Sequence, residues 1–315
     1  MEPIIRSLHH VTATVDDAQA DLDFFSRDLG LRLVKKTVNF DNPGVYHFYY
    51  GNETGTPGTI WTTFPYKDKG VRVGTKGAGQ ITTTSFSVPA SALDFWRRRL
   101  KQQGATTTDR DTGFGEEAIS VTDPSGLVID LVGTRADERA PWIRGDVGQE
   151  EAIRGLHSVT LTIRHPEPSI AFLQEIMGFE VVNEAEGRTR LAAGKRDEPG
   201  KTLEIVHAPD APLAQNGLGT VHHVAFAVSD PDDQVRKRDE LLKLGWQVTE
   251  IMDRQYFTSI YFREPGGVLY EIATVPPGFT IDETVKGLGQ ELKLPPWEEP
   301  RRERIEQVLP KISLR

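Results

Sequence analysis

The stretch Leu8-His9-His10-Val11-Thr12-Ala13-Thr14-Val15 opens the first of four similar segments, and the fold follows from that repetition. Its apolar and β-branched residues predict a strand. An amphipathic pattern begins at Asp16 or Asp17 and ends at Gly30, which is typical of a helix that stops at a glycine. Further strand-like runs complete the segment. The other three copies begin in the same way, at Ile81, Leu156 and His222.

This repeated order of elements predicts an α+β fold of four βαβββ modules, forming two domains of curved mixed sheets. The helix of the fourth copy carries Val235, Leu241 and Leu242 as its apolar positions. A charged, proline-containing linker near residue 140 predicts a boundary between two pairs of modules, residues 1–140 and 141–280. Residues 281–315 are expected to form a mostly irregular tail with one short helix around residues 302–308.

The composition narrows the class of protein. A chain of 315 residues suits two domains, and 37% hydrophobic with 26% charged residues is an ordinary soluble balance. The net charge of −9 and the lack of a basic stripe argue against a nucleic-acid partner. The absence of cysteine excludes disulfides and thiolate ligands. No apolar run approaches the roughly 20 residues that span a bilayer, and the first residues carry no signal-peptide pattern, so we expect a cytoplasmic protein without a membrane partner.

Two histidine pairs and one glutamate stand out as candidate ligands. His9-His10 and His222-His223 each open a strand-like run, and Glu271 lies in the last strand-like run of the fourth copy. Two imidazoles and one carboxylate are the set that holds non-haem Fe(II) and leaves positions open for a substrate and dioxygen. Mn(II) remains open, because the ligand set alone does not distinguish neighbouring metals.

The chain resembles the vicinal oxygen chelate superfamily, which includes glyoxalase I, bleomycin-resistance proteins and extradiol dioxygenases. Within it, the chain looks most like the hydroquinone ring-cleaving dioxygenases. The resemblance covers nearly the whole chain. The stretches that carry it are Leu8-His9-His10-Val11-Thr12, Asp28-Leu29-Gly30-Leu31, Val221-His222-His223-Val224 and Pro265-Gly266-Gly267-Val268-Leu269-Tyr270-Glu271-Ile272-Ala273.

The resemblance implies a metal in a cleft between the first and fourth copies, with His10, His223 and Glu271 as its ligands. It also implies a set of residues that contact the substrate or support the ligands, namely His9, Thr12, His222, Arg254 and Tyr261. Strict strand alternation places His9 and His222 on the face opposite their neighbours unless the strand twists or bulges. His47 lies in another strand-like run that could line the cleft, but it is expected to be structural.

The repeat predicts one live cleft and one degenerate cleft. The counterparts of the three ligands in copies two and three are Ser158, Thr83 and Asp130, a poor set for a divalent metal. Glyoxalase I has a fourth protein ligand, and a loose alignment of residues 58–62 with 201–205 puts Trp61 at that corner of the live cleft. Because an indole does not ligate a metal, that corner is expected to stay open.

We therefore expect an Fe(II)-dependent, extradiol-type ring-cleaving dioxygenase that acts on a small hydroquinone-like diol with dioxygen, with detoxification of quinones as its implied role. Two alternatives stay open at this point. One is a glyoxalase-like metal-dependent isomerase or lyase, and the other is a non-enzymatic protein that binds aromatic or quinone compounds. The sequence is compatible with a homo-oligomer, and it does not identify the ring substituents or the cleavage position.

Overall fold

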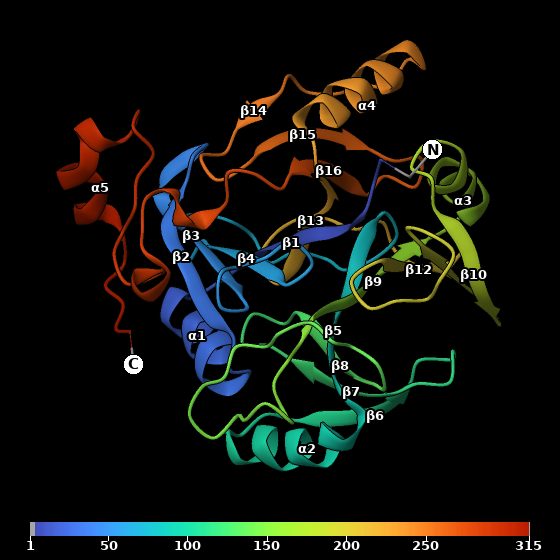
Figure 1. The fold of residues 1–315 in the computed structure, drawn as a ribbon, viewed down its shortest axis with the longest axis horizontal. Helices are drawn as coiled ribbons and strands as arrows, with labels where there is room; N and C mark the ends of the chain where they lie inside the picture. Colours follow the sequence, from blue (N-terminus) through green and yellow to red (C-terminus); the bar gives the residue numbers. More distant parts are fainter. Residues whose placement is uncertain (1–3, 315) are drawn as a thin grey trace.

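Two eight-stranded sheets form the centre of the protein, and helices cover their outer sides (Figure 1). The computed structural model describes residues 4–314. The first sheet has the strand order β14-β15-β16-β13-β1-β4-β3-β2, and the second has the order β10-β11-β12-β9-β5-β8-β7-β6. Parallel and antiparallel neighbours occur in both sheets. The predicted α+β fold of four βαβββ modules with curved mixed sheets is confirmed.

The first sheet combines the first and fourth modules. The elements of the first module are β1 (Ser7–Val15), α1 (Ala18–Leu22), the π-helix η1 (Asp23–Asp28), β2 (Arg32–Asn39), β3 (Asn42–Gly51) and β4 (Ile60–Pro65). Those of the fourth module are β13 (Thr220–Val228), α4 (Pro231–Lys243), β14 (Met252–Asp253), β15 (Thr258–Arg263) and β16 (Leu269–Thr274).

The second sheet combines the two middle modules. The elements of the second module are β5 (Gln80–Pro89), η2 (Ala90–Ala92), α2 (Leu93–Gln102), β6 (Thr107–Asp111), β7 (Glu117–Thr122) and β8 (Val128–Thr134). Those of the third are β9 (Gly155–Ile163), α3 (Pro166–Glu175), β10 (Glu180–Ala185), β11 (Arg188–Ala192) and β12 (Thr202–His207). Each sheet thus joins modules from both halves of the sequence, while the division at residues 140 and 280 stays a prediction.

The helices follow from local capping and from an apolar face. Asp17 caps α1, because its carboxylate accepts hydrogen bonds from two backbone amides of the first turn. In α4, however, only Leu241 of the three expected apolar residues is buried, whereas Val235 and Leu242 are 41% and 42% exposed. The prediction that these three residues form the buried face of α4 was wrong, because polar side chains occupy part of that face. The amide of Gln234 donates to the carbonyls of Thr258 and Ile272 and is buried in this way.

A β-bulge at the same place in each module shapes the centre of both sheets. Where β1 pairs with β13, His9 and His222 are each an extra residue that has no partner in the register. Where β5 pairs with β9, Thr82 and His157 are the extra residues. A bulge turns the extra side chain away from strict alternation. The fold therefore allows both members of each histidine pair to lie near one site.

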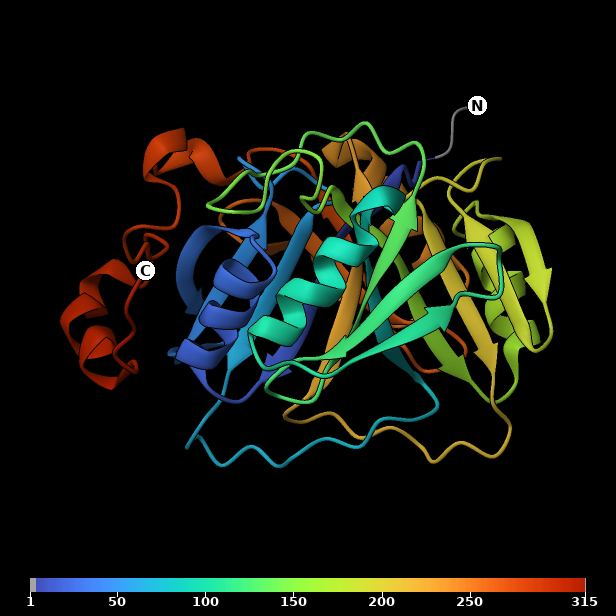
Figure 2. The ribbon, with the colours of Figure 1, turned by 90° about the horizontal axis from the view of Figure 1, so that it is seen from below.

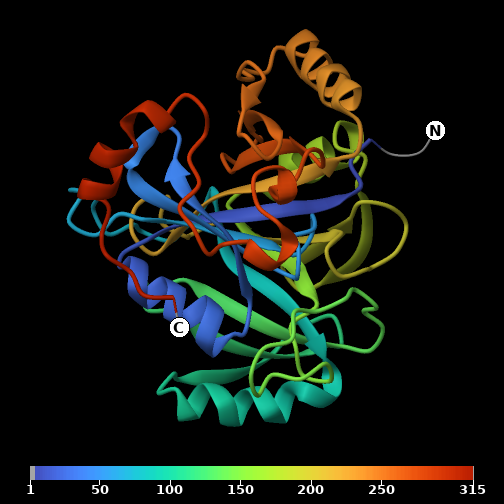
Figure 3. The same cartoon turned by 60° about the vertical axis from the view of Figure 1, so that its left-hand side comes forward.

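Residues 281–314 cover the outer edge of the first sheet at β2 (Figure 3). The ammonium group of Lys35 on β2 is fully buried and is paired with Asp282 and Glu283. Lys36 on the same strand forms a bridge with Leu292. Unpaired edge strands favour association, so this cover protects the sheet. The short helices of this region are η3 (Phe279–Ile281), η4 (Val285–Gly287), η5 (Glu299–Arg301) and α5 (Arg302–Val308), of which α5 was expected.

Two long loops, residues 66–79 and 208–219, run side by side below the sheets (Figure 2). Their backbones pair between Val73 and Leu218 and between Thr75 and Gln215. Gly77 is required there, because a Cβ at this position would lie 2.0 Å from the carbonyl oxygen of Pro212. Among the described residues, no helix has the length and apolar character to cross a membrane.

Candidate metal centre

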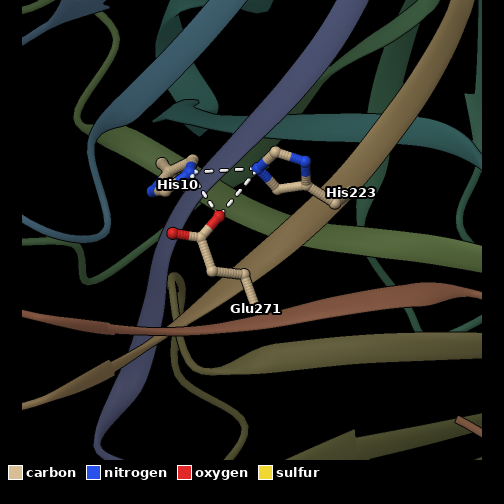
Figure 4. A group of neighbouring side chains, drawn as sticks. All are labelled: His10, His223 and Glu271. Carbon is tan, nitrogen blue, oxygen red and sulfur yellow. Dashed lines mark hydrogen bonds and ion pairs between the residues drawn. The ribbon is translucent and has the colours of Figure 1, made fainter. Parts of the chain in front are cut away.

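Three predicted ligands converge on one point at the centre of the first sheet (Figure 4). Nε2 of His10 on β1 lies 3.3 Å from Nε2 of His223 on β13. Oε2 of Glu271 on β16 lies 3.2 Å from the first nitrogen and 2.8 Å from the second. All three side chains are buried. Within residues 4–314, no other group of three or more His, Asp or Glu side chains is arranged to hold a metal ion.

The bulges place a second imidazole behind each ligand imidazole. Nδ1 of His9 lies 2.8 Å from Nδ1 of His10, and Nδ1 of His222 lies 2.7 Å from Nδ1 of His223. A ligand imidazole needs its lone pair on Nε2, so its Nδ1–H must donate to the neighbouring histidine. Burial lowers the pKa of His9 and of His222 to about 3, so both are neutral acceptors at physiological pH.

The two supporting histidines differ in what their other side faces. His9 is buried, packs with its ring 5.0 Å from that of Phe257 and is hydrogen-bonded to the backbone of Thr274. It lines a cavity on the far side of the centre. His222 is half-buried and lines the same cavity as the three ligands. His9 can therefore contact His10 but not a molecule in the cavity of the three candidate ligands, whereas His222 can contact both His223 and such a molecule.

Glu271 is held as an ionised carboxylate. Burial by itself raises its pKa, but the imidazoles of His10 and His223 outweigh burial and bring that pKa well below the usual value. Its Oε1 accepts a short hydrogen bond from the hydroxyl of Ser259 on β15. Its Oε2 is buried and has no well-aligned hydrogen-bond donor among the described residues. A buried carboxylate oxygen beside two outward nitrogen lone pairs is a donor set that fits a divalent metal.

A cavity of about 410 Å³ opens beside the three ligands. Its wall combines polar groups with aromatic rings, as small-molecule sites do. Besides the ligands, it is lined by Thr12, Thr14, Asn39, Phe40, Asp41, His47, Tyr49, Phe64, Tyr66, His222, Met252, Arg254, Phe257, Tyr261 and Leu269.

Arg254 and Tyr261 form a polar pair in this wall. Nε of Arg254 donates to Oη of Tyr261 at 3.2 Å, and its guanidinium also pairs with Asp41 of the first module at 3.2 Å. Burial raises the pKa of the Tyr261 hydroxyl, and the charge of Glu271 raises it further, so the phenol stays protonated. The pair offers hydrogen-bond donors to a negatively charged group in the cavity.

Of the eight residues named from the sequence, seven line this cavity, and His9 lies behind it. Three further residues at the site were not among these eight. Ser259 alternates with Tyr261 on β15, a signal that could have identified it. His47, expected to be structural, lines the cavity two positions before Tyr49 on β3. Phe257 precedes β15 in an irregular segment and had no sequence signal.

The prediction that Trp61 occupies the corner of the fourth ligand of glyoxalase I was wrong by one position. In the parallel pair of β1 and β4, His10 is opposite Ile60 and Thr12 is opposite Thr62. In the equivalent pair of β9 and β12, Ser158 is opposite Thr202 and Thr160 is opposite Glu204. Thr62 is therefore the counterpart of Glu204. Trp61 points the other way and is buried in the core, because successive side chains of a strand alternate between the two faces.

The second cleft has charged side chains in place of a metal. The guanidinium of Arg190 is 1% exposed and binds Glu116, Asp197 and Glu204. Asp130, the counterpart of Glu271, is paired with Arg110. These cations already neutralise the carboxylates that a metal would need. The predicted degenerate cleft is consistent with this arrangement.

Comparison with known proteins agrees with the fold. A relative from Bacillus subtilis (strain 168), "Putative ring-cleaving dioxygenase MhqO", is 41% identical over 308 residues, which is 98% of this chain and 97% of the relative. A chlorohydroquinone/hydroquinone 1,2-dioxygenase from Sphingobium indicum is 37% identical over 300 residues, which is 93% of this chain and 92% of that protein.

The crystal structure of a "putative dioxygenase" from Bacillus subtilis subsp. subtilis str. 168 superposes with a TM-score of 0.93 at 41% identity. The match covers 100% of this chain and 99% of that one. The model of one family matches residues 7–131 and 155–272, which together include nearly all of the four modules. The chain therefore belongs to the Glyoxalase/Bleomycin resistance protein/Dioxygenase superfamily.

Proposed function

We propose that this protein is a ring-cleaving dioxygenase that acts on hydroquinone-like aromatic diols, with Fe(II) held by His10, His223 and Glu271. The observation that carries the proposal is the convergence of two imidazoles and one carboxylate on the wall of an aromatic-lined cavity. The names of full-length relatives, including a chlorohydroquinone/hydroquinone 1,2-dioxygenase, support it.

The position of Thr62 supports a site with open coordination positions. It occupies the place that Glu204 has in the second cleft, and its hydroxyl is engaged with Thr12. No fourth His, Asp or Glu joins the three ligands within the described chain. Fe(II) in such a three-ligand set supplies open positions for a ring oxygen and dioxygen and the electrons that activate dioxygen.

The surrounding side chains supply hydrogen bonds and orientation. Nδ1 of His222 accepts from His223, so Nε2 of His222 carries the hydrogen and donates to an oxygen of the diol in the cavity. Arg254 and Tyr261 donate further hydrogen bonds to the negative charge that develops on the diol. The rings of Phe64 and Phe257 provide apolar walls for an aromatic substrate. In the overall reaction, one carbon–carbon bond of the ring breaks and both atoms of dioxygen enter the product.

Oxygen uptake tests this proposal. Protein loaded anaerobically with Fe(II) is mixed with a panel of hydroquinones and catechols in an oxygen electrode. We expect uptake of one dioxygen per diol, with loss of the aromatic ultraviolet band. The Glu271→Gln variant should lose both metal and uptake, whereas Ser158→Ala, the matched position of His10 in the second cleft, should keep both. Stoichiometric iron binding without uptake for any diol would favour the isomerase or binding-protein alternatives.

A further inference from the structure

Three hydrogen-bonded side chains on adjacent strands form a polar chain in the cavity wall. The hydroxyl of Thr62 on β4 donates to Oγ1 of Thr12 on β1 at 2.8 Å. Nε2 of His47 on β3 lies 2.9 Å from Oγ1 of Thr62. Both threonines are fully buried, and His47 is half-buried beside the cavity. None of the ligand contacts requires His47, so its place in the wall needs another explanation.

The direction of this chain determines which atoms remain available. A threonine hydroxyl has one hydrogen, and that of Thr62 is donated to Thr12. Thr62 can therefore only accept from His47, so Nε2 of His47 carries the hydrogen and Nδ1 has the lone pair. Nδ1 of His47 has no partner among residues 4–314. The imidazole stays neutral, because burial and the nearby positive charges hold the pKa of His47 well below its usual value.

His47 lies away from the metal ligands along the strands. His10, Thr12 and Thr14 are every second residue of β1 and therefore share one face, so Thr14 lies four residues along the strand from His10. Thr14 is opposite Phe64 on β4, and the ring of His47 lies 4.3 Å from that of Phe64. The centre of the Tyr49 ring lies 4.0 Å from the centre of the His47 ring. These two rings restrict the imidazole, and the register of β4 places the neighbouring Phe64 four residues beyond Ile60, the partner of His10.

The second hydroxyl of a hydroquinone needs a hydrogen-bond acceptor such as Nδ1 of His47. The two hydroxyls of a para-diol lie on opposite sides of the ring, so only one can reach the metal. The other enters the cavity as a hydrogen-bond donor and loses affinity if it finds no acceptor. We propose that His47 is a specificity-determining residue whose Nδ1 accepts a hydrogen bond from the ring hydroxyl remote from the metal. This assignment rests on the proposed function and predicts a preference for para-diols over monophenols.

Binding under anaerobic conditions tests the assignment without turnover. Fe(II)-loaded protein is titrated calorimetrically with hydroquinone, with phenol, which lacks the remote hydroxyl, and with catechol, whose second hydroxyl lies next to the first. One neutral hydrogen bond corresponds to a preference of about 10-fold for hydroquinone over phenol. We expect His47→Phe to remove this preference while leaving the affinity for catechol unchanged. His47→Gln, whose amide both donates and accepts, should restore part of it.

Controls separate this assignment from the proposed function. His207, an exposed histidine at the end of β12, serves as a matched position, and His207→Phe should keep the preference. If His47→Phe does not fold, Thr62→Val tests the same chain, because it removes the partner that directs Nδ1, and it should reduce the preference. An unchanged preference in a variant of His47, with oxygen uptake by the wild type intact, would overturn only the role of His47. Absence of both diol binding and uptake in the wild type would overturn the proposed function and this assignment with it.

Discussion

Nδ1 of His222 lies 2.7 Å from Nδ1 of His223, although the two residues are neighbours in a β-strand. Neighbouring side chains of a regular strand point to opposite faces, so this contact depends on the bulge at His222. The same relationship joins His9 to His10 at the symmetric bulge. Each ligand imidazole is thus oriented by the residue before it in the sequence.

We expect His9→Phe to weaken metal binding about 10- to 100-fold, as loss of a partner that orients a ligand does. The phenyl ring keeps the packing against Phe257 but cannot accept the hydrogen of His10 Nδ1. Competition with a chromophoric chelator measures the affinity. His157→Phe is the matched control, because His157 occupies the equivalent bulge of the second cleft. Equal metal affinities of the two variants would contradict an orienting role for His9.

Ser259→Ala should weaken metal binding about 10-fold and leave the fold intact. The hydroxyl of Ser259 is fully buried and donates to Oε1 of Glu271, so its removal leaves a buried carboxylate oxygen without a donor. Metal titration and thermal unfolding together measure the effect. A drop in thermal stability of the metal-free protein without a change in metal affinity would show that Ser259 supports the sheet and not the ligand.

The sequence predicted the features that the repeat and the ligand chemistry control. Four modules follow from one recurring pattern, and the site follows from residue types that few other functions need, namely two histidine pairs and Glu271. Details that depend on the register between strands were less accessible. Thr62 and Trp61 differ by one position, and only the pairing of β4 with β1 decides which of them faces the cavity.

Polar residues that are buried by tertiary partners were also missed. Gln234 of α4 occupies a buried position because two backbone carbonyls outside the helix accept its amide hydrogens, and no helical pattern contains that information. His47 looked structural because its partner Thr62 is 15 residues away on the neighbouring strand. In both cases the deciding contact is long-range, whereas periodicity reports only local preference.

The contribution of Asp21 to the stability of the protein should decrease as the pH rises from about 4 to about 8. Burial raises the pKa of this carboxyl to about 8, although Thr63 and Tyr50 donate hydrogen bonds to it. The unfolded value is about 3.9, so the folded state binds more protons between the two pKa values. Protonation of Asp21 therefore favours folding at low pH, and this contribution is lost as the pH rises through 8.

The Asp21→Asn variant tests this dependence, because an amide does not titrate. We expect the free energy of unfolding of the wild type, measured with urea, to fall relative to that of the variant by on the order of 1–3 kcal/mol between pH 5 and pH 8. The candidate metal ligands lie on the other face of the sheet, because Tyr50, which contacts Asp21, alternates with the cavity-lining Tyr49, so metal affinity should not change. Parallel pH profiles of wild type and variant would contradict a raised pKa for Asp21.

Arg190→Met should destabilise the protein without affecting the candidate metal centre. The guanidinium of Arg190 is buried among Glu116, Asp197 and Glu204, and its removal leaves these carboxylates without their shared cation. Breaking a buried ion pair from one side costs about 3–5 kcal/mol. Urea unfolding measures this loss, and the double variant Arg190→Met with Glu204→Gln should recover part of it, because one uncompensated charge is gone. Unchanged stability would show that solvent already screens the cluster, and loss of metal binding would show that the two clefts are coupled through the paired sheets.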